Sequence, residues 1–139
     1  MNNHLISYQT GSTAAVAIII GNRIYTANAG DSWVVISCEG WAINLTKDHN
    51  LEREDEKCRF ILPGAIDQGW VRGRLEITWG FGDADLKGIE KKEDKENISK
   101  WIAYVDFTVQ PEIKEYQINP FKDEFLIVAS DGLFKSMKS

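Results

Sequence analysis

The chain has few of the residues that mark specialised classes of protein. Its 139 residues include only two cysteines, Cys38 and Cys58. Two cysteines are too few for a disulfide framework, and this pair is too widely spaced for a zinc knuckle. We therefore expect each to be a small, buried or half-buried apolar residue.

Positive charge and long hydrophobic runs are also scarce. Sixteen Lys and Arg against 21 Asp and Glu give a formal net charge of −5, without the basic stripe that nucleic-acid binding needs. The longest apolar stretch, Thr13–Ile20, is far shorter than the roughly 20 residues that span a bilayer. The polar start, Met1–His4, does not resemble a signal peptide. These absences predict a soluble cytoplasmic or nuclear protein that is not secreted and binds neither nucleic acid nor membrane.

The rest of the composition is that of a globular domain. Apolar residues make up 43% of the chain and charged residues 27%, and five tryptophans are spread along it. A chain of this length is sufficient for one domain with a buried core, or for part of one.

Apolar runs separated by short turn signals predict a mainly antiparallel β structure. The first four runs should form a meander of local hairpins, and the first and last, which are apolar throughout, should be central strands. The expected strands are Thr13–Ile20, Arg23–Asn28, Trp33–Ser37, Trp41–Thr46, Val71–Trp79, Trp101–Val109, Glu112–Ile118 and Glu124–Ser130.

One helix and one charged loop are expected between these strands. Asn50 is a suitable N-cap, several acidic residues follow it, and Pro63-Gly64 should end the helix, which would cover a sheet. Residues 84–100 include a mixed-charge run without an apolar face and should form a solvated loop.

Two aspartates, Asp31 and Asp131, stand where apolar strands meet glycine turns. A partly desolvated carboxylate must be paired, hydrogen-bonded or bound to a cation. Each aspartate either caps its own turn, as Asp often does beside Gly, or contributes to a site for Mg²⁺ or Mn²⁺. Periodicity alone does not show that the two carboxylates meet.

Six motifs follow one another in the order and approximate spacing of the metal-dependent type 2C (PPM-type) protein serine/threonine phosphatases, which the chain resembles. They are Gly11–Ala14, Ala27–Ser32, Leu45–His49, Val71–Leu75 with Gly80–Asp83, Pro111–Ile113, and Asp123–Leu133.

The resemblance implies an α+β fold, a sandwich of antiparallel β-sheets flanked by helices, here truncated at both ends. Residues 1–139 would form one partial phosphatase domain whose motifs span residues 11–133. In that family, water activated by Mg²⁺ or Mn²⁺ hydrolyses phosphoserine and phosphothreonine. By motif position, Asp131, with Gly132 beside it, matches the core metal site, and Asp31 matches an additional, weaker site. Asp83 matches a motif near the family's flap and is not assigned as a ligand.

The sequence contains neither the family's Asp-Gly-His-Gly-Gly motif nor its C-terminal Asp-Asn motif. The family's N-terminal acidic residue and phosphate-binding arginine are also missing. We therefore assign no catalytic residue and expect weak or absent metal binding. Further departures are Trp33 in place of an arginine, Thr78-Trp79 in place of Ser-Arg, and Lys135 in place of an acidic residue.

Three hypotheses remain at this stage. The chain is an incomplete phosphatase that is inactive alone, a non-catalytic phosphatase-like (pseudophosphatase) module that binds or regulates a partner, or a generic β-rich domain. The first implies a phosphoprotein substrate and the second a regulatory protein partner. A truncated sandwich exposes strand faces and edges, so we also expect an oligomer or association with the missing segments.

Overall fold

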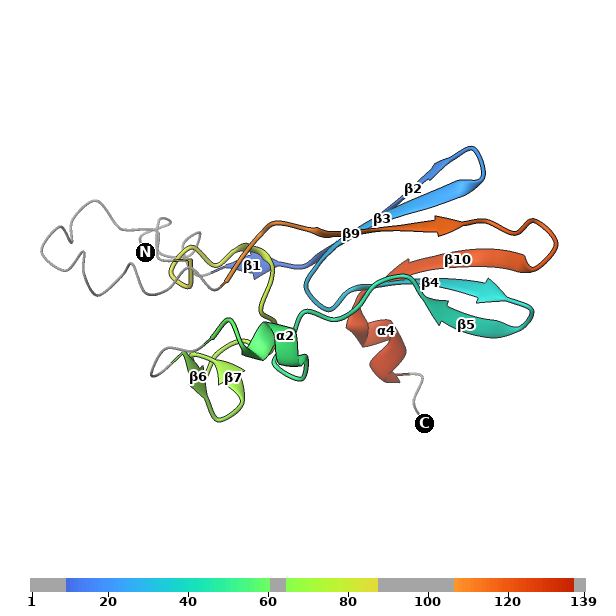
Figure 1. The fold of residues 1–139 in the computed structure, drawn as a ribbon. Coiled ribbons are helices and arrows are strands. Elements are labelled where there is room, and N and C mark those ends of the chain that lie inside the picture. The colour runs from blue at the N-terminus through green and yellow to red at the C-terminus, as the bar shows by residue number, and fades with distance from the viewer. Residues whose placement is uncertain (1–9, 61–64, 88–106, 137–139) are drawn as a thin grey trace, which may run out of the picture. The chain divides into compact units, whose positions relative to one another are not determined.

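The computed structural model describes residues 10–60, 65–87 and 107–136, which belong to two compact units (Figure 1). The first unit comprises Met1–Ser12 and His49–Val109, and the second comprises Thr13–Asp48 and Gln110–Ser139. No helix in the described ranges is long and apolar enough to cross a membrane.

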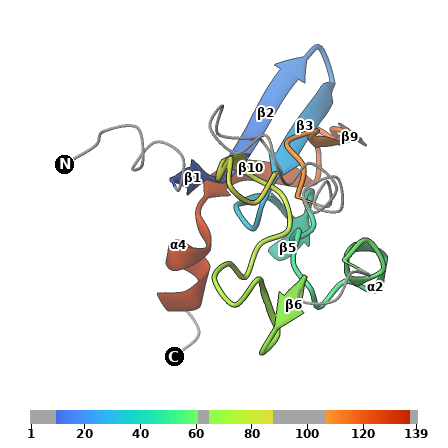
Figure 2. The ribbon, with the colours of Figure 1, turned by 90° about the vertical axis from the view of Figure 1, so that its left-hand side faces the viewer.

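The second unit contains two three-stranded antiparallel sheets and one helix (Figures 1 and 2). One sheet has the order β2-β3-β9, with β2 at Ala14–Ile20, β3 at Arg23–Ala29 and β9 at Glu112–Gln117. The other has the order β10-β4-β5, with β10 at Asp123–Ala129, β4 at Trp33–Cys38 and β5 at Trp41–Asn44. Helix α4, Asp131–Ser136, follows β10 directly.

The two sheets of this unit share one apolar core. Ile24 on β3 clusters with Val34 and Ile36 on β4 and with Leu45, and all four are at most 6% exposed. Since the cluster takes residues from both sheets, the sheets form the two layers of a sandwich. The predicted sandwich of antiparallel sheets is thus confirmed.

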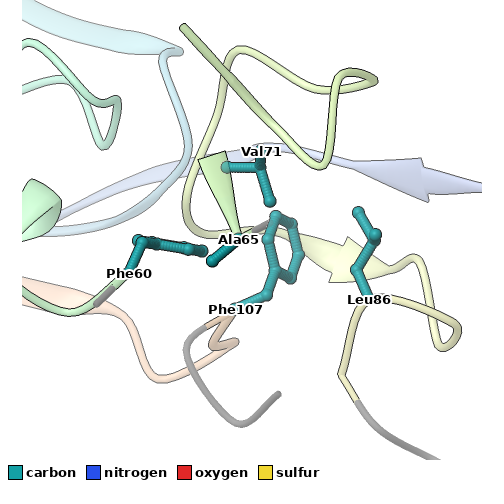
Figure 3. Packing of buried hydrophobic residues seen from close by; sticks show 5 residues of the cluster. All are labelled: Phe60, Ala65, Val71, Leu86 and Phe107. Atoms are coloured by element: carbon teal, nitrogen blue, oxygen red, sulfur yellow. The ribbon is translucent and has the colours of Figure 1, made fainter. Parts of the chain in front are cut away.

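The first unit is built from short elements around a core of its own. Strand β1 pairs with β8, and β6 pairs with β7. Figure 3 shows the core side chains converging around the Phe107 ring. The elements are β1 (Gly11–Ser12), α2 (Glu54–Lys57), β6 (Ile66–Asp67), β7 (Trp70–Val71) and β8 (Phe81–Gly82), and the buried core residues are Phe60, Ala65, Val71, Leu86 and Phe107.

The helix predicted from Asn50 is shorter and begins later than expected. Helix α2 starts at Glu54, and its N-cap position is Arg53, which makes no side-chain cap hydrogen bond. The Asn50 Oδ1 atom instead accepts a hydrogen bond from the backbone N–H of Glu52 at 3.0 Å. The asparagine therefore stabilises a turn before the helix, which is its common alternative role.

The continuous strand predicted over Val71–Trp79 is wrong. Strand β7 ends at Val71, and Arg72 and Gly73 then adopt positive φ angles of 49° and 63°. These left-handed residues turn the chain, and the backbone N–H of Val71 donates to the carbonyl of Leu75 at 2.7 Å.

Other strand predictions also need correction. In the described part of the chain β2 and β10 are edge strands, although their apolar sequences predicted central ones. The predicted meander is divided, because the β2–β3 and β4–β5 hairpins belong to different sheets. Cys58 is exposed, whereas Cys38 is half-buried as predicted.

Two predicted elements fall mainly outside the described residues. Of the predicted strand over 101–109, only residues 107–109 are described. Of the predicted loop over 84–100, only residues 84–87 are described, and they form a turn.

Candidate functional site

Asp31 and Asp131 lie at the same end of the β10-β4-β5 sheet. Strands β4 and β10 are antiparallel, and their last paired residues at this end are Trp33 and Ala129. Asp31 precedes Trp33 by two positions and Asp131 follows Ala129 by two positions. The register therefore brings to one sheet end, which we call the aspartate end, two residues that are far apart in the sequence.

The turn before Asp31 is fixed by a glycine and a buried asparagine. Gly30 has φ of +111°, and a Cβ atom there would lie 2.3 Å from the Thr13 Cγ2 atom, so only glycine fits. The Asn28 side chain, 2% exposed, donates hydrogen bonds from Nδ2 to the carbonyl oxygens of Gly30 at 3.0 Å and Lys47 at 3.1 Å. The turn is therefore held by the fold itself.

Hydroxyl groups fix the chain on the other side of Asp31. The Thr13 and Ser32 hydroxyls are hydrogen-bonded at 2.7 Å, and the backbone N–H of Val34 donates to the Thr46 hydroxyl at 3.0 Å. Three of these four residues are almost completely buried: Ser32 is 8%, Val34 0% and Thr46 6% exposed. Asp31 is thus presented from a rigid turn.

Asp131 is the first residue of α4 and forms an ion pair within that helix. Its Oδ2 atom lies 2.6 Å from the Nζ atom of Lys135, four positions later. The hydrogen bond from Lys135 is the main cause that lowers the pKa of the Asp131 carboxyl, and the N–H of Gly132 contributes in the same direction. The carboxylate is therefore charged at neutral pH and already has a cation beside it.

Helix α4 is attached to the beginning of β4 by an aromatic contact. The rings of Trp33 and Phe134 stack with centroids 4.4 Å apart and planes 25° from parallel. Phe134 immediately precedes Lys135, so this contact limits the positions that α4 and its lysine adopt. Trp33, which stands where the resembled family has arginine, thus has a packing role here.

The residues at the aspartate end do not amount to a complete site for Mg²⁺ or Mn²⁺. Within the described ranges no group of three or more His, Cys, Asp or Glu residues is arranged to hold a metal ion. Asp31 and Asp131 offer two carboxylates, whereas six ligands surround Mg²⁺. The carbonyl of Gly132, the third residue position matched to the metal site, accepts a hydrogen bond from the Ser136 hydroxyl within α4. The donor set of this chain therefore does not fit a tightly bound cation by itself.

Asp83 has a structural environment in the first unit. It is 4% exposed, has a positive φ of 44°, and its backbone N–H donates to the carbonyl of Thr10 at 2.8 Å. Its carboxyl group packs so closely on Gly11 that a Cβ atom there would lie 1.7 Å from Oδ2. Burial, and then the charge of Asp85, raise the pKa of this carboxyl group.

The sequence interpretation missed a buried carboxylate in the first unit, Glu56. Its side chain is 3% exposed, and its Oε2 atom accepts hydrogen bonds from the Thr78 hydroxyl at 2.6 Å, the Trp79 indole N–H at 2.6 Å and the Arg59 guanidinium at 2.8 Å. Glu56 lies within the run of acidic residues that was interpreted as favouring the beginning of the predicted helix. Only its spacing of three from Arg59 hinted at a pair.

His49, the last residue of the Leu45–His49 motif, is completely buried and belongs to the same neighbourhood. Its ring stacks on that of Trp79, with centroids 4.1 Å apart and planes 9° from parallel. Its carbonyl oxygen accepts the backbone N–H of Thr78 at 2.8 Å. The histidine thus helps to fix the segment that carries two of the Glu56 donors.

Comparisons with known proteins agree on one family. The model of the family described as protein phosphatase 2C matches residues 2–139. The chain is 33% identical over 133 residues to the probable protein phosphatase 2C 27 of Oryza sativa subsp. japonica, covering 95% of this chain and 35% of that protein. It is 34% identical over 131 residues to the protein phosphatase 2C homolog 2 of Hypocrea jecorina, covering 94% and 28% respectively. The chain therefore spans about a third of the length of these relatives.

Solved structures show the same fold at lower sequence identity. A serine-threonine phosphatase 2C from Toxoplasma gondii has a TM-score of 0.70 at 21% identity, covering 97% of this chain and 46% of that one. A Caenorhabditis elegans sex determining protein has a TM-score of 0.67 at 22% identity, covering 95% and 30%. The sandwich, the matched residues and the curated relatives together show that this chain belongs to the protein phosphatase 2C family.

Proposed function

We propose that this chain carries part of the catalytic region of a Mg²⁺- or Mn²⁺-dependent protein serine/threonine phosphatase, with phosphoserine and phosphothreonine proteins as substrates. The observation that carries the proposal is the β4–β10 register, which brings Asp31 and Asp131 to one end of a sheet. The match to the phosphatase family over residues 2–139 supports it.

The 139-residue chain should not catalyse hydrolysis alone. In such enzymes bound metal ions lower the pKa of a water molecule and neutralise the phosphoryl oxygens. At the aspartate end this chain offers the carboxylates of Asp131 and Asp31, too few donors to hold such an ion tightly. Its sequence also lacks the Asp-Gly-His-Gly-Gly and Asp-Asn segments. We propose that activity requires metal-binding residues in addition to those that this sequence contains.

The experiment is a phosphatase assay on the purified 139-residue chain. Hydrolysis of p-nitrophenyl phosphate and of a phosphothreonine peptide is measured at increasing Mn²⁺, with Asp131→Asn as the matched variant. We expect no Mn²⁺-dependent hydrolysis above the level of Asp131→Asn. Robust hydrolysis that this substitution abolishes would overturn the proposed dependence on further ligands.

A second candidate function is a non-catalytic phosphatase-like module that binds a regulatory protein partner. The pairing of Asp131 with Lys135 favours it, because the carboxylate is already neutralised within the chain. A stable partner recovered with the folded chain, together with silence in the phosphatase assay, would distinguish this module from an incomplete enzyme.

We also propose that the chain self-associates through β2. Strand β2 is an edge strand in the described part of the chain, and it has no charged residue from Ala14 to Ile20. Val16, Ile18 and Ile20 are 48%, 55% and 63% exposed. If β2 strands from two copies of the chain pair antiparallel, no charged side chains repel each other, because β2 has none. An exposed apolar edge strand also favours the addition of another strand.

A further inference from the structure

We infer that Lys135 is a built-in cation that occupies the charge-balancing position at Asp131 and keeps divalent ions away from this carboxylate. The inference deepens the proposed function, and rests on it, because it concerns how the same aspartate is regulated. The ammonium group of Lys135 lies beside the Asp131 carboxylate, at the position that a metal ion would need to reach.

The geometry of α4 favours this ion pair. Asp131 precedes Lys135 by four positions, the spacing and order at which an acidic and a basic side chain meet best on a helix. The separation of 2.6 Å between Nζ and Oδ2 is that of a charge-assisted hydrogen bond. The lysine therefore holds one of the two carboxylate oxygens that an ion would use.

The pair is also held in place by its neighbours. Phe134 stacks on Trp33 at the beginning of β4, and the Ser136 hydroxyl donates to the carbonyls of Gly132 at 2.9 Å and Leu133 at 2.8 Å. Lys135 is thus flanked on both sides by residues with fixed contacts.

The positive charge of Lys135 accounts for the exclusion of divalent cations from Asp131. A divalent cation that approaches Asp131 must displace the ammonium group or bind beside a positive charge, and both weaken its binding. The Asp131 side chain is 33% exposed, so the ion has access from solvent and the barrier is electrostatic. Removing the lysine charge should therefore reveal a cation affinity that the intact chain suppresses.

The test measures Mn²⁺ binding, by calorimetry and by water proton relaxation, to the full 139-residue chain. We expect Lys135→Met, which keeps most of the apolar stem, to tighten Mn²⁺ binding about tenfold, equivalent to ~1.4 kcal/mol. Lys135→Asp should tighten it further. Adding Asp131→Asn to Lys135→Met should abolish the gain, which assigns it to this carboxylate.

The matched control is Lys122→Met, which removes a different lysine ion pair of the second unit, between Lys122 and Glu39 at 3.1 Å. It should leave Mn²⁺ binding unchanged. Equal Mn²⁺ binding by the intact chain and Lys135→Met, whether both are weak or both tight, would overturn the inference. Because the readout is binding, it is independent of the phosphatase assay: a tenfold gain without hydrolysis supports the inference whatever that assay shows.

Discussion

Replacing Glu56 with alanine removes the common acceptor of three hydrogen bonds inside the first unit. The Thr78 hydroxyl and the Trp79 indole N–H lose their acceptor, and Thr78 is completely buried. An unsatisfied buried donor costs about 1–3 kcal/mol. Arg59 is 29% exposed at its side chain and regains hydration more easily. Removing one partner of a buried charge pair typically costs about 3–5 kcal/mol, which is our expected loss in the free energy of unfolding for Glu56→Ala.

Urea unfolding followed by tryptophan fluorescence and near-UV circular dichroism measures this loss. Trp70, Trp79 and Trp101 belong to the first unit and Trp33 and Trp41 to the second, so a background with both Trp33→Phe and Trp41→Phe reports the first unit alone and keeps the Trp79 donor. The matched control is Glu54→Ala, an exposed acidic residue on the same helix, which should cost less than about 1 kcal/mol. A loss below about 1 kcal/mol for Glu56→Ala would refute the view that this carboxylate organises the first unit.

Three further predictions concern the second unit. Burial, followed by the hydrogen bond with Asp123, raises the pKa of Tyr116 to about 12. The contribution of the protonated Tyr116 to the free energy of unfolding is therefore complete below pH ~10 and is lost as the pH rises towards 12. Absorbance at 295 nm should show one tyrosine titrating late, and Asp123→Asn should bring it back towards the others. Gly30→Ala should lower stability by about 1–3 kcal/mol in thermal unfolding, because its φ of +111° and the Thr13 methyl group leave no room for Cβ; an unchanged melting temperature would contradict this. Ile18→Lys should reduce self-association in sedimentation velocity, whereas a parent chain that is monomeric at high concentration would disprove pairing through β2.

The strands of the second unit were predictable because their sequences carry local signals. Gly21 and Asn22 lie between β2 and β3, and Gly21 adopts the positive φ of 60° that such a hairpin turn uses. The assignment of the two hairpins to different sheets was not predictable, since it depends on pairing with the distant strands β9 and β10.

The first unit was predicted less well because its order depends on long-range contacts. Arg72 adopts a left-handed backbone conformation that its residue type does not signal. The buried position of Glu56 depends on donors 22 and 23 positions later, which no helical periodicity can show. The core residue Phe107 likewise meets Phe60 only in the folded unit.

The aspartate end was predictable as two separate residues but not as one place. Motif order picked out Asp31 and Asp131, whereas their convergence at one sheet end required the β4–β10 register. The sequence marked Lys135 as a departure, and the structure adds that its ammonium group contacts the Asp131 carboxylate.

The discontinuous second unit has a consequence for how the protein is made. Residues 49–109 are synthesised between its two parts, and Ser37 on β4 meets Glu124 on β10 across 87 positions. At ~5–20 residues per second, a ribosome takes about 3–12 s to make the intervening segment. During that interval the nascent β2–β3 and β4–β5 hairpins lack the strands that complete their sheets. The edges of β3 and β4 that later pair with β9 and β10 are then unpaired and open to strand addition by neighbouring nascent chains.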